Sequence, residues 1–232
     1  FEIIKEKLSK IDELFPNNVN SLFLVGGCWR AMAKIHMNLT DYPLKVLQGY
    51  KVSVNNFDST IENICNLKTY ELLKYTSSSE ERVRLLPYAS KVLLAIYEKF
   101  SIKKLFFSGY GIREGIFFSR FSNEIRKLNP LLQACAYLEQ NRSRFPGFGK
   151  VLFEWLLPIF PGIDNNKRNL FLAACYLHDT IWQAHPDYRS EVCFETVTGA
   201  NLSGIDHKGR IFLALSLMSR YKKTDINKIN KK

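Results

Sequence analysis

The chain has 232 residues, of which 46% are hydrophobic and 13% aromatic, so it can bury a core and form one or two domains. No apolar run reaches the roughly 18 residues that a membrane-spanning helix needs, and the best candidate, VLFEWLLPIF, is interrupted by Glu154 and Pro158. The net charge of +11 favours a polyanionic partner, whether nucleic acid, anionic lipid headgroups or a phosphate chain, without choosing among them.

The cysteines and the first residues bear on the cellular compartment. Five cysteines occur without a C-x-x-C pair, which argues against a disulfide framework or a zinc knuckle. The chain begins at Phe1 with an amphipathic segment in which no signal-peptide pattern is visible. We therefore expect a cytoplasmic protein, and we interpret the first residue as a cut within a longer chain.

The first elements combine helical periodicity with a strand and two glycines. Residues 3–15 repeat apolar side chains at three- and four-residue spacing, which predicts a short helix. In SLFLVGGCWRAMAKIHM, the four apolar residues Leu22–Val25 precede two glycines and a helical pattern. This order predicts a strand, a tight turn and a helix. Two more helical patterns follow at 58–75 and 79–99.

The segment KKLFFSGYGIREGIFFSRF repeats the order of strand, glycine turn and helix. Leu105–Phe107 predicts a second strand, and Ser108–Gly111 predicts the turn after it. We therefore predict that residues 1–121 form an α+β domain.

After Phe121 the strand signals end and only helical periods remain. Pro–Gly, His–Pro and Ser–Gly pairs separate these periods. The sequence therefore predicts an all-helical domain over residues 122–232. The helical patterns lie at 134–141, 150–160, 168–182, 190–201 and 209–221.

The two glycine turns are candidate phosphate sites. Glycines directly after a strand let backbone N–H groups approach a phosphate, and the dipole of the following helix favours the anion. Gly26 and Gly27, with Arg30 on the first helical turn, fit this chemistry, although they also fit an ordinary tight connection. In the second turn, Arg113 can neutralise an anion or form an internal ion pair with Glu114.

The stretch YLHDTIWQAHPDYRSE places His178 beside Asp179, as in a metal-binding pair. A divalent metal needs several converging nitrogen and oxygen ligands, and the only histidine upstream is His36. Three interpretations stay open: a metal site at His178–Asp179, a polyanion track, or hydrogen bonds within a helix interface. The track would include His185, Arg189, His207 and Arg210.

The order of these motifs resembles one enzyme family. GGCWRAM and the run ERVRLLPYASKVLLAIYEKFSIKKLFFSGYGIREGIFFSRF resemble the end of the second actin-like domain of the Ppx/GppA exopolyphosphatases and guanosine pentaphosphate phosphatases. AACYLHDTIWQAHPDYRSE and GIDHKGRIFLALSLMSRY are similar to the HD-related helical domain of longer members. The resemblance covers about residues 20–222. It implies a partial ribonuclease-H-like (actin-like ATPase) domain over 1–121 and an HD-like helical domain over 122–232.

The resemblance also implies an activity. Members of this family hydrolyse the terminal phosphate of inorganic polyphosphate or pppGpp with Mg²⁺, and a homodimer with no membrane and no specific nucleic-acid partner is expected. Gly26, Gly27 and Cys28 match the second phosphate loop, in which Cys28 replaces a small hydroxyl residue.

No stretch matches the family's first phosphate loop or its catalytic glutamate, so no catalytic residue is assigned in this chain. Phosphoryl transfer depends on several elements acting together, and we therefore expect a C-terminal portion of the enzyme that is inactive alone. Two alternatives remain: a stand-alone HD-type metal-dependent phosphohydrolase, and a non-catalytic polyanion-binding module.

Overall fold

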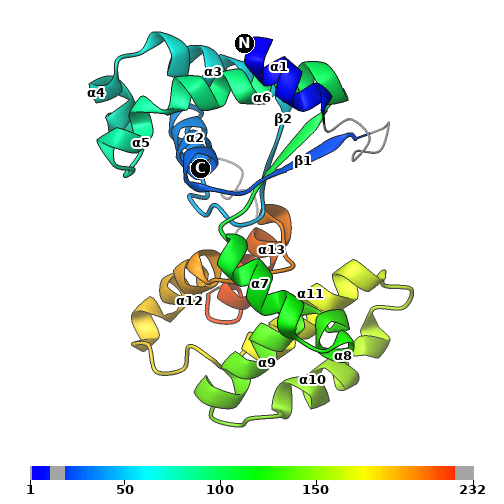
Figure 1. Ribbon diagram of the computed structural model, residues 1–232. Helices are drawn as coiled ribbons and strands as arrows, with labels where there is room; N and C mark the ends of the chain where they lie inside the picture. Colours follow the sequence, from blue (N-terminus) through cyan, green and yellow to red (C-terminus); the bar gives the residue numbers. More distant parts are fainter. Residues whose placement is uncertain (1, 11–18, 223–232) are drawn as a thin grey trace. The chain divides into compact units, whose positions relative to one another are not determined.

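The computed structural model describes residues 2–10 and 19–222, and its contacts divide the chain into two units, residues 1–120 and 121–232 (Figure 1). Each unit has its own hydrophobic core. The helix predicted over 3–15 is present as α1, Glu2–Ser9, and its residues from 11 onward lie outside the described ranges.

A three-stranded sheet in the order β1-β3-β2 forms the centre of the first unit. β1 (Ser21–Leu24) pairs in parallel with β3 (Lys104–Phe107), and β2 (Tyr50–Ser53) pairs with β3 in the antiparallel direction. The two predicted strands are confirmed as β1 and β3, each within one residue of its predicted bounds. β2 was not predicted, because its four residues carry little periodicity and their pairing with β3 defines the strand.

The helices of the first unit follow the predicted periodicity with different breaks. The pattern at 58–75 is divided after Asn66, and α3 begins earlier than predicted because Ser53 Oγ accepts a hydrogen bond from Asn56 N at 3.2 Å. The pattern at 79–99 is divided at Leu85, since Pro87 starts a new helix. The elements are α2 (Gly27–Leu39), α3 (Val54–Asn66), α4 (Thr69–Leu72), η2 (Leu73–Tyr75), α5 (Glu80–Arg84), α6 (Leu86–Phe100) and α7 (Ile112–Arg120).

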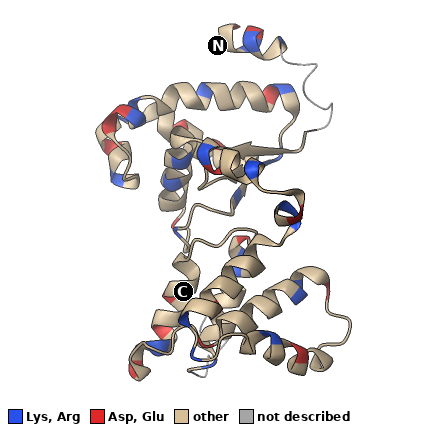
Figure 2. Ribbon diagram, turned by 60° about the horizontal axis from the view of Figure 1, so that its bottom comes forward, with Lys and Arg blue, Asp and Glu red and all other residues tan. Residues whose placement is uncertain are grey.

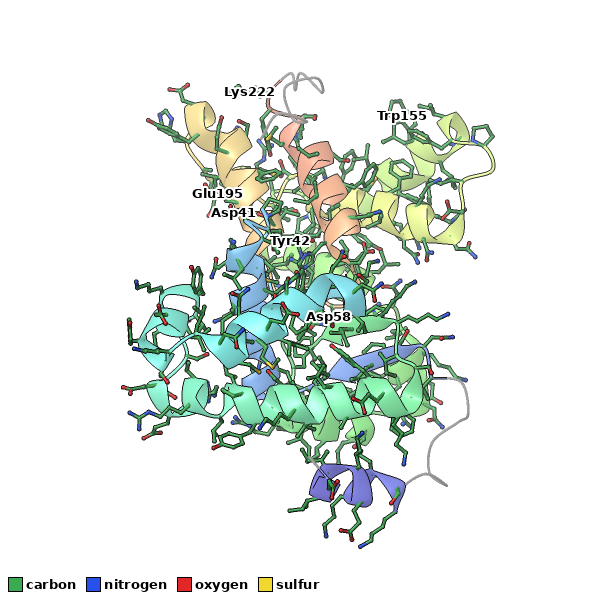
Figure 3. The ribbon with its side chains drawn as sticks, turned by 90° about the horizontal axis from the view of Figure 1, so that it is seen from above. Asp41, Tyr42, Asp58, Trp155, Glu195 and Lys222 are labelled. Atoms are coloured by element: carbon green, nitrogen blue, oxygen red, sulfur yellow. The ribbon has the colours of Figure 1, made fainter. Side chains whose placement is uncertain are left out.

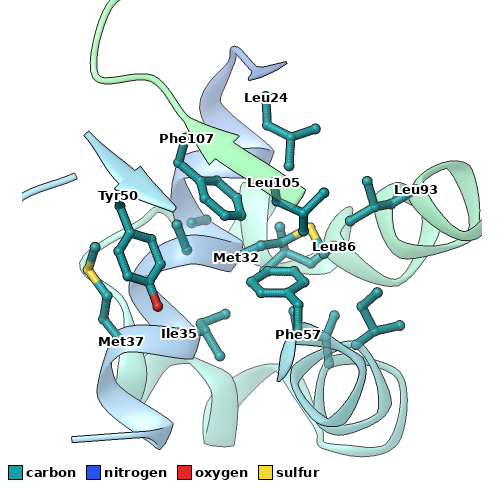
Figure 4. Close-up of a cluster of buried hydrophobic side chains, with 14 of the residues drawn as sticks. Leu24, Met32, Ile35, Met37, Tyr50, Phe57, Leu86, Leu93, Leu105 and Phe107 are labelled. Carbon is teal, nitrogen blue, oxygen red and sulfur yellow. The ribbon is translucent and has the colours of Figure 1, made fainter. Parts of the chain in front are cut away.

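Helices α2, α3 and α6 pack together on one face of the sheet. Leu24, Leu105 and Phe107 point from the strands into this core, where side chains of the three helices meet them (Figure 4). On the opposite face of the sheet, Phe23 and Phe106 stack with ring centroids 4.8 Å apart, and Phe23 is 69% exposed. The first unit is therefore a sheet with one helix-covered face.

The second unit is all-helical in its described residues. Side-chain caps begin four of its α-helices, with Ser122 before α8, Asn129 before α9, Asp164 before α11 and Asp206 before α13. The core lies among α9, α11, α12 and α13. The elements are α8 (Asn123–Lys127), α9 (Pro130–Arg142), α10 (Phe148–Leu156), η3 (Leu157–Ile159), α11 (Asn165–Leu177), η4 (Pro186–Tyr188), α12 (Arg189–Gly199) and α13 (His207–Met218).

Gly149 lets α10 pack closely against α11. A Cβ atom at this position would lie 2.6 Å from Cys175 O and 2.8 Å from Tyr176 Cα, which is closer than carbon contacts allow. The amide of Gly149 also donates to the buried carboxylate of Glu139 at 2.6 Å. Gly149 therefore joins α10 to α9 through this hydrogen bond and to α11 through close packing.

The predicted fold class is confirmed: a mixed α+β part with a small sheet precedes an all-helical part. Lys and Arg occur on helices of both units (Figure 2). Large apolar side chains are exposed as well, among them Trp155 on α10, which is 73% exposed (Figure 3). None of the described helices is long and apolar enough to cross a membrane.

Candidate functional site

The two glycine turns lie beside each other because β1 and β3 are parallel neighbours. Leu24 is in register with Phe107, and Ser108 N donates to Leu24 O at 3.1 Å. Both turns therefore leave the same edge of the sheet, at the carboxyl ends of the strands. Ligands of open α/β sheets bind at this edge.

The first turn ends in the open N-terminus of α2. Gly26 is the N-cap residue and has φ +137°, a conformation that favours glycine. No side chain caps this helix end, so the first N–H groups of α2 are available to an anion. Cys28, at the second helical position, is half-buried.

Arg30 connects the two turns. Its Nε donates to Gly26 O at 3.4 Å and its Nη1 donates to Gly109 O at 3.5 Å. Both distances are at the long end for hydrogen bonds. The guanidinium is therefore held between the turns by weak contacts and can still donate to a ligand. The predicted site residue Arg30 thus lies at the first turn, together with Gly26 and Gly27.

Arg82 is a further residue at the first turn, which the sequence reasoning missed. It belongs to α5, and a Cβ atom at Gly27 would lie 2.8 Å from its Nε and 3.1 Å from its Cζ. The side chain of Arg82 makes no hydrogen bond or ion pair with the described part of the chain. The contact depends on the packing of α5 against α2, so no pattern in the sequence around Arg82 predicts it. Two guanidinium groups, from Arg30 and Arg82, therefore flank the glycine turn.

The second turn differs from the first because its amides are already hydrogen-bonded. Gly109 N donates to Gln48 Oε1 at 2.8 Å, Tyr110 N to Ser108 Oγ at 3.1 Å, and Gly111 N to Glu114 Oε2 at 2.6 Å. Internal side chains thus occupy the donors that a phosphate would need. The second turn positions Arg30 and supports the first turn.

Glu114 acts as an internal cap at the start of α7. The amide of Gly111 and its own amide lower the pKa of the Glu114 carboxyl, and the charges of Arg113 and Arg30 act in the same direction. The carboxylate is bonded to the backbone, and Arg113 lies exposed on α7. Arg113 thus adds positive charge next to the second turn.

His178 and Asp179 lie where α11 ends. Asp179 is 3% exposed, and its carboxylate accepts two hydrogen bonds from the Arg144 guanidinium, at 2.6 and 3.1 Å, and one from Arg144 N at 3.1 Å. Arg220 Nη2 lies 3.6 Å from the same carboxylate. His178 Nδ1 donates to Cys175 O at 2.7 Å.

These partners leave no ligand set for a metal at this position. Across residues 2–10 and 19–222, no group of three or more His, Cys, Asp or Glu side chains converges as metal ligands require. His36, the upstream histidine, is buried in the first unit and lies 2.6 Å from Thr60 Oγ1 through its Nδ1. The residues present do not fit a divalent ion, and Asp179 serves as the centre of an ion-pair network.

Arg189 and Arg210 are bound to backbone carbonyls inside the second unit. Arg189 donates to Trp182 O at 2.7 Å and to Ala184 O at 3.0 and 3.2 Å. Arg210 is 0% exposed, and its Nη atoms donate to carbonyls at and beyond the end of α12. We therefore assign Arg210 to the structure of this unit, since it has no surface to offer a ligand. The Arg210 acceptors are the carbonyls of Val197, Thr198, Ala200 and Leu202.

The two remaining histidine candidates differ in exposure. His185 is largely exposed and lies 3.8 Å from the carboxylate of Asp187. His207 is 7% exposed at the start of α13. Of the proposed track residues, only His185 therefore presents most of its side chain to solvent.

The first unit is thus an α+β fold in which parallel strands end in adjoining turns, beside an uncapped helix start and two arginines, and in the sequence an all-helical unit follows it. Comparison with protein families gives two matches: residues 1–124 match the Ppx/GppA phosphatase family, and residues 131–232 match the exopolyphosphatase C-terminal domain. No curated protein matches the chain at a significant level. The chain belongs to the Ppx/GppA phosphatase family, a family of phosphohydrolases.

Proposed function

We propose that the chain binds the phosphate groups of a phosphoanhydride substrate, inorganic polyphosphate or pppGpp, at the Gly26–Gly27 turn. The observation that carries the proposal is the uncapped start of α2 between two guanidinium groups. Backbone donors and the helix dipole favour an anion there, and Arg30 and Arg82 add two positive charges. Family membership supports this choice of substrate class.

We further propose that this chain holds substrate without hydrolysing it. The resemblance places the first phosphate loop and the water-activating glutamate in a part of the enzyme that no stretch here matches. Glu114, whose carboxyl feels the charge of Arg30, accepts a hydrogen bond from the amide of Gly111 and is therefore not free to activate water. The Mg²⁺ that the resemblance implies has no ligand set in the described ranges, so we derive no step through it.

The Asp179 network disfavours the alternative of an HD-type metal hydrolase. A metal at His178–Asp179 would have to displace Arg144 from a buried carboxylate that it binds through three hydrogen bonds. The homodimer expected from the resemblance stays a prediction.

Binding of long-chain polyphosphate at low and high salt tests the proposal. Affinity is expected to fall steeply with salt, because phosphate contacts release counterions. Arg82→Ala and Arg30→Ala should each weaken binding roughly tenfold. Arg84→Ala is the matched control, since it removes a positive charge from the same helix at a residue that is paired with Glu80 at 2.5 Å.

Two results would contradict the proposal. If Arg84→Ala weakens binding as much as Arg82→Ala, only general charge is read and the chain is a non-specific polyanion binder. If the pure chain releases phosphate from polyphosphate at the rate of an intact enzyme, the proposal that it lacks turnover is wrong.

A further inference from the structure

A hollow lined by lysines lies beside the C-terminal half of α2. Its volume is about 460 Å³, within the size range of small-molecule sites. Asn38, in its lining, is eleven residues along α2 from Gly27, or roughly 16 Å at 1.5 Å per residue. The lining residues are Lys34, Met37, Asn38, Lys45, Lys74, Tyr75, Thr76 and Ser77.

Three separate segments each bring one lysine to this hollow. Lys34 comes from α2, Lys45 from the loop before β2, and Lys74 from η2. The lining contains no carboxylate, and none of the three amines has an ion pair with a carboxylate of the described residues. Bringing three like charges together without a counter-charge raises the free energy of the folded chain, and a bound anion would lower it.

The hydrogen bonds of these lysines hold two of the amines in place and leave donors available. Lys34 Nζ donates to Ser77 Oγ at 3.2 Å, and Lys45 Nζ donates to Met37 O at 2.8 Å. Each ammonium group has three N–H donors, so at least two remain on each of these amines. Asn38 Nδ2 donates to Tyr75 O at 2.7 Å and fixes the segment that carries Ser77.

We propose that this hollow is an anion site for a short phosphate chain of two or three phosphate groups. Lysine binds phosphate as a point charge, and the lining contributes three such charges without a carboxylate. The charge of the three amines matches that of a diphosphate or triphosphate group. The site is independent of the proposed substrate turn, because it shares no residue with it.

Titration of the full chain with tripolyphosphate at low salt, followed by ¹H–¹⁵N NMR, tests the site. The titration uses an Arg30→Ala/Arg82→Ala background, which weakens the glycine turn and leaves the hollow as the main oligophosphate site. Amide shifts are expected at Asn38 and Ser77. No shift at these amides, with either tripolyphosphate or ATP, would overturn the proposal.

Substitutions in the same background give the second test. Lys34→Ala/Lys74→Ala should weaken tripolyphosphate binding by about tenfold or more, whereas the control Lys91→Ala, on the exposed side of α6, should leave it unchanged. All three lysines lie at least partly at the surface, and an unchanged thermal midpoint would show that the fold is kept. Equal affinity of the double variant and the control would refute the site.

The nature of the ligand follows from a comparison of two probes. Equal affinities for tripolyphosphate and ATP would assign recognition to the phosphate chain alone. Tighter binding of ATP would assign the site to a nucleotide, and both outcomes support an anion site in the hollow.

Discussion

The two units of the chain use arginine in opposite ways. In the first unit, Arg82 lies over Gly27 and makes no hydrogen bond or ion pair with the described residues, and Arg30 makes only long contacts. In the second unit, Arg210 is fully buried and its guanidinium donates to four backbone carbonyls. An arginine can serve a ligand only where the fold has not already satisfied its donors. The net charge of the chain therefore overstates its binding capacity.

Glycine shows the same contrast between the units. The space beside Gly27 is occupied by the flexible end of the Arg82 side chain, which can move aside. The space beside Gly149 is occupied by the backbone of Cys175 and Tyr176, which cannot. Gly27 therefore leaves room for a mobile side chain at the turn, whereas Gly149 allows two helices to pack with their backbones in contact.

The largest expected change in stability comes from substitution of Arg210. Arg210→Met should lower the free energy of unfolding by about 3–5 kcal/mol, because several buried carbonyls lose their donor at once. Arg82→Met, the counterpart in the first unit, should change it by less than about 0.5 kcal/mol. Urea unfolding followed by circular dichroism measures both. Lys208→Met, an exposed neighbour of Arg210, controls for loss of charge, and equal effects of Arg210→Met and Lys208→Met would remove the contrast.

The next effect concerns close packing. Gly149→Ala should destabilise the chain by about 1–3 kcal/mol, since the added methyl group overlaps backbone atoms. Gly199→Ala in α12 is the matched control, because nothing lies within 4 Å of its added Cβ. Thermal unfolding measures the difference. A Gly149→Ala variant as stable as the control would show that α10 can move away from α11 at no cost.

An effect similar in size to that of Gly149→Ala, but dependent on pH, is expected from the Asp179 ion pair. Hydrogen bonds from Arg144 lower the pKa of Asp179 below its ordinary value of 3.8. A lowered folded-state pKa means that the pair stabilises the chain above pH 3.8 and that this contribution is lost as pH falls through the folded pKa. Asp179→Asn should therefore be less stable than the parent by about 1–3 kcal/mol at pH 7.

That difference should shrink as the pH is lowered below 3.8, where the parent carboxylate becomes protonated. Urea midpoints between neutral and acidic pH measure it, with Asp187→Asn as the exposed control. A difference that stays constant with pH would mean that Asp179 stabilises the second unit through packing instead of charge.

The sequence predicts features that depend on neighbours along the chain. β1, β3 and both glycine turns follow from local apolar runs and glycines, and the helical second unit follows from its periods and breaks. β2 could not be predicted in this way, because pairing with β3 defines its four residues.

Features that depend on tertiary contacts cannot be predicted from neighbouring residues in the sequence. Arg82 reaches Gly27 only through the packing of α5 against α2. Arg144 reaches Asp179 across 35 residues of sequence, and this distant partner makes Asp179 the centre of an ion-pair network. The adjacent His178 and Asp179 suggested metal binding because only their neighbours in sequence were visible.

The one-sided pairing of β1 has a consequence for the behaviour of the chain at high concentration. β1 pairs with β3, and no other strand of the described residues pairs with its outer edge. An open edge offers backbone donors and acceptors to a strand of another molecule, and here it adjoins the exposed ring of Phe23. The net charge of +11 opposes such encounters by mutual repulsion. Added salt screens this repulsion, so self-association through β1 should increase with ionic strength.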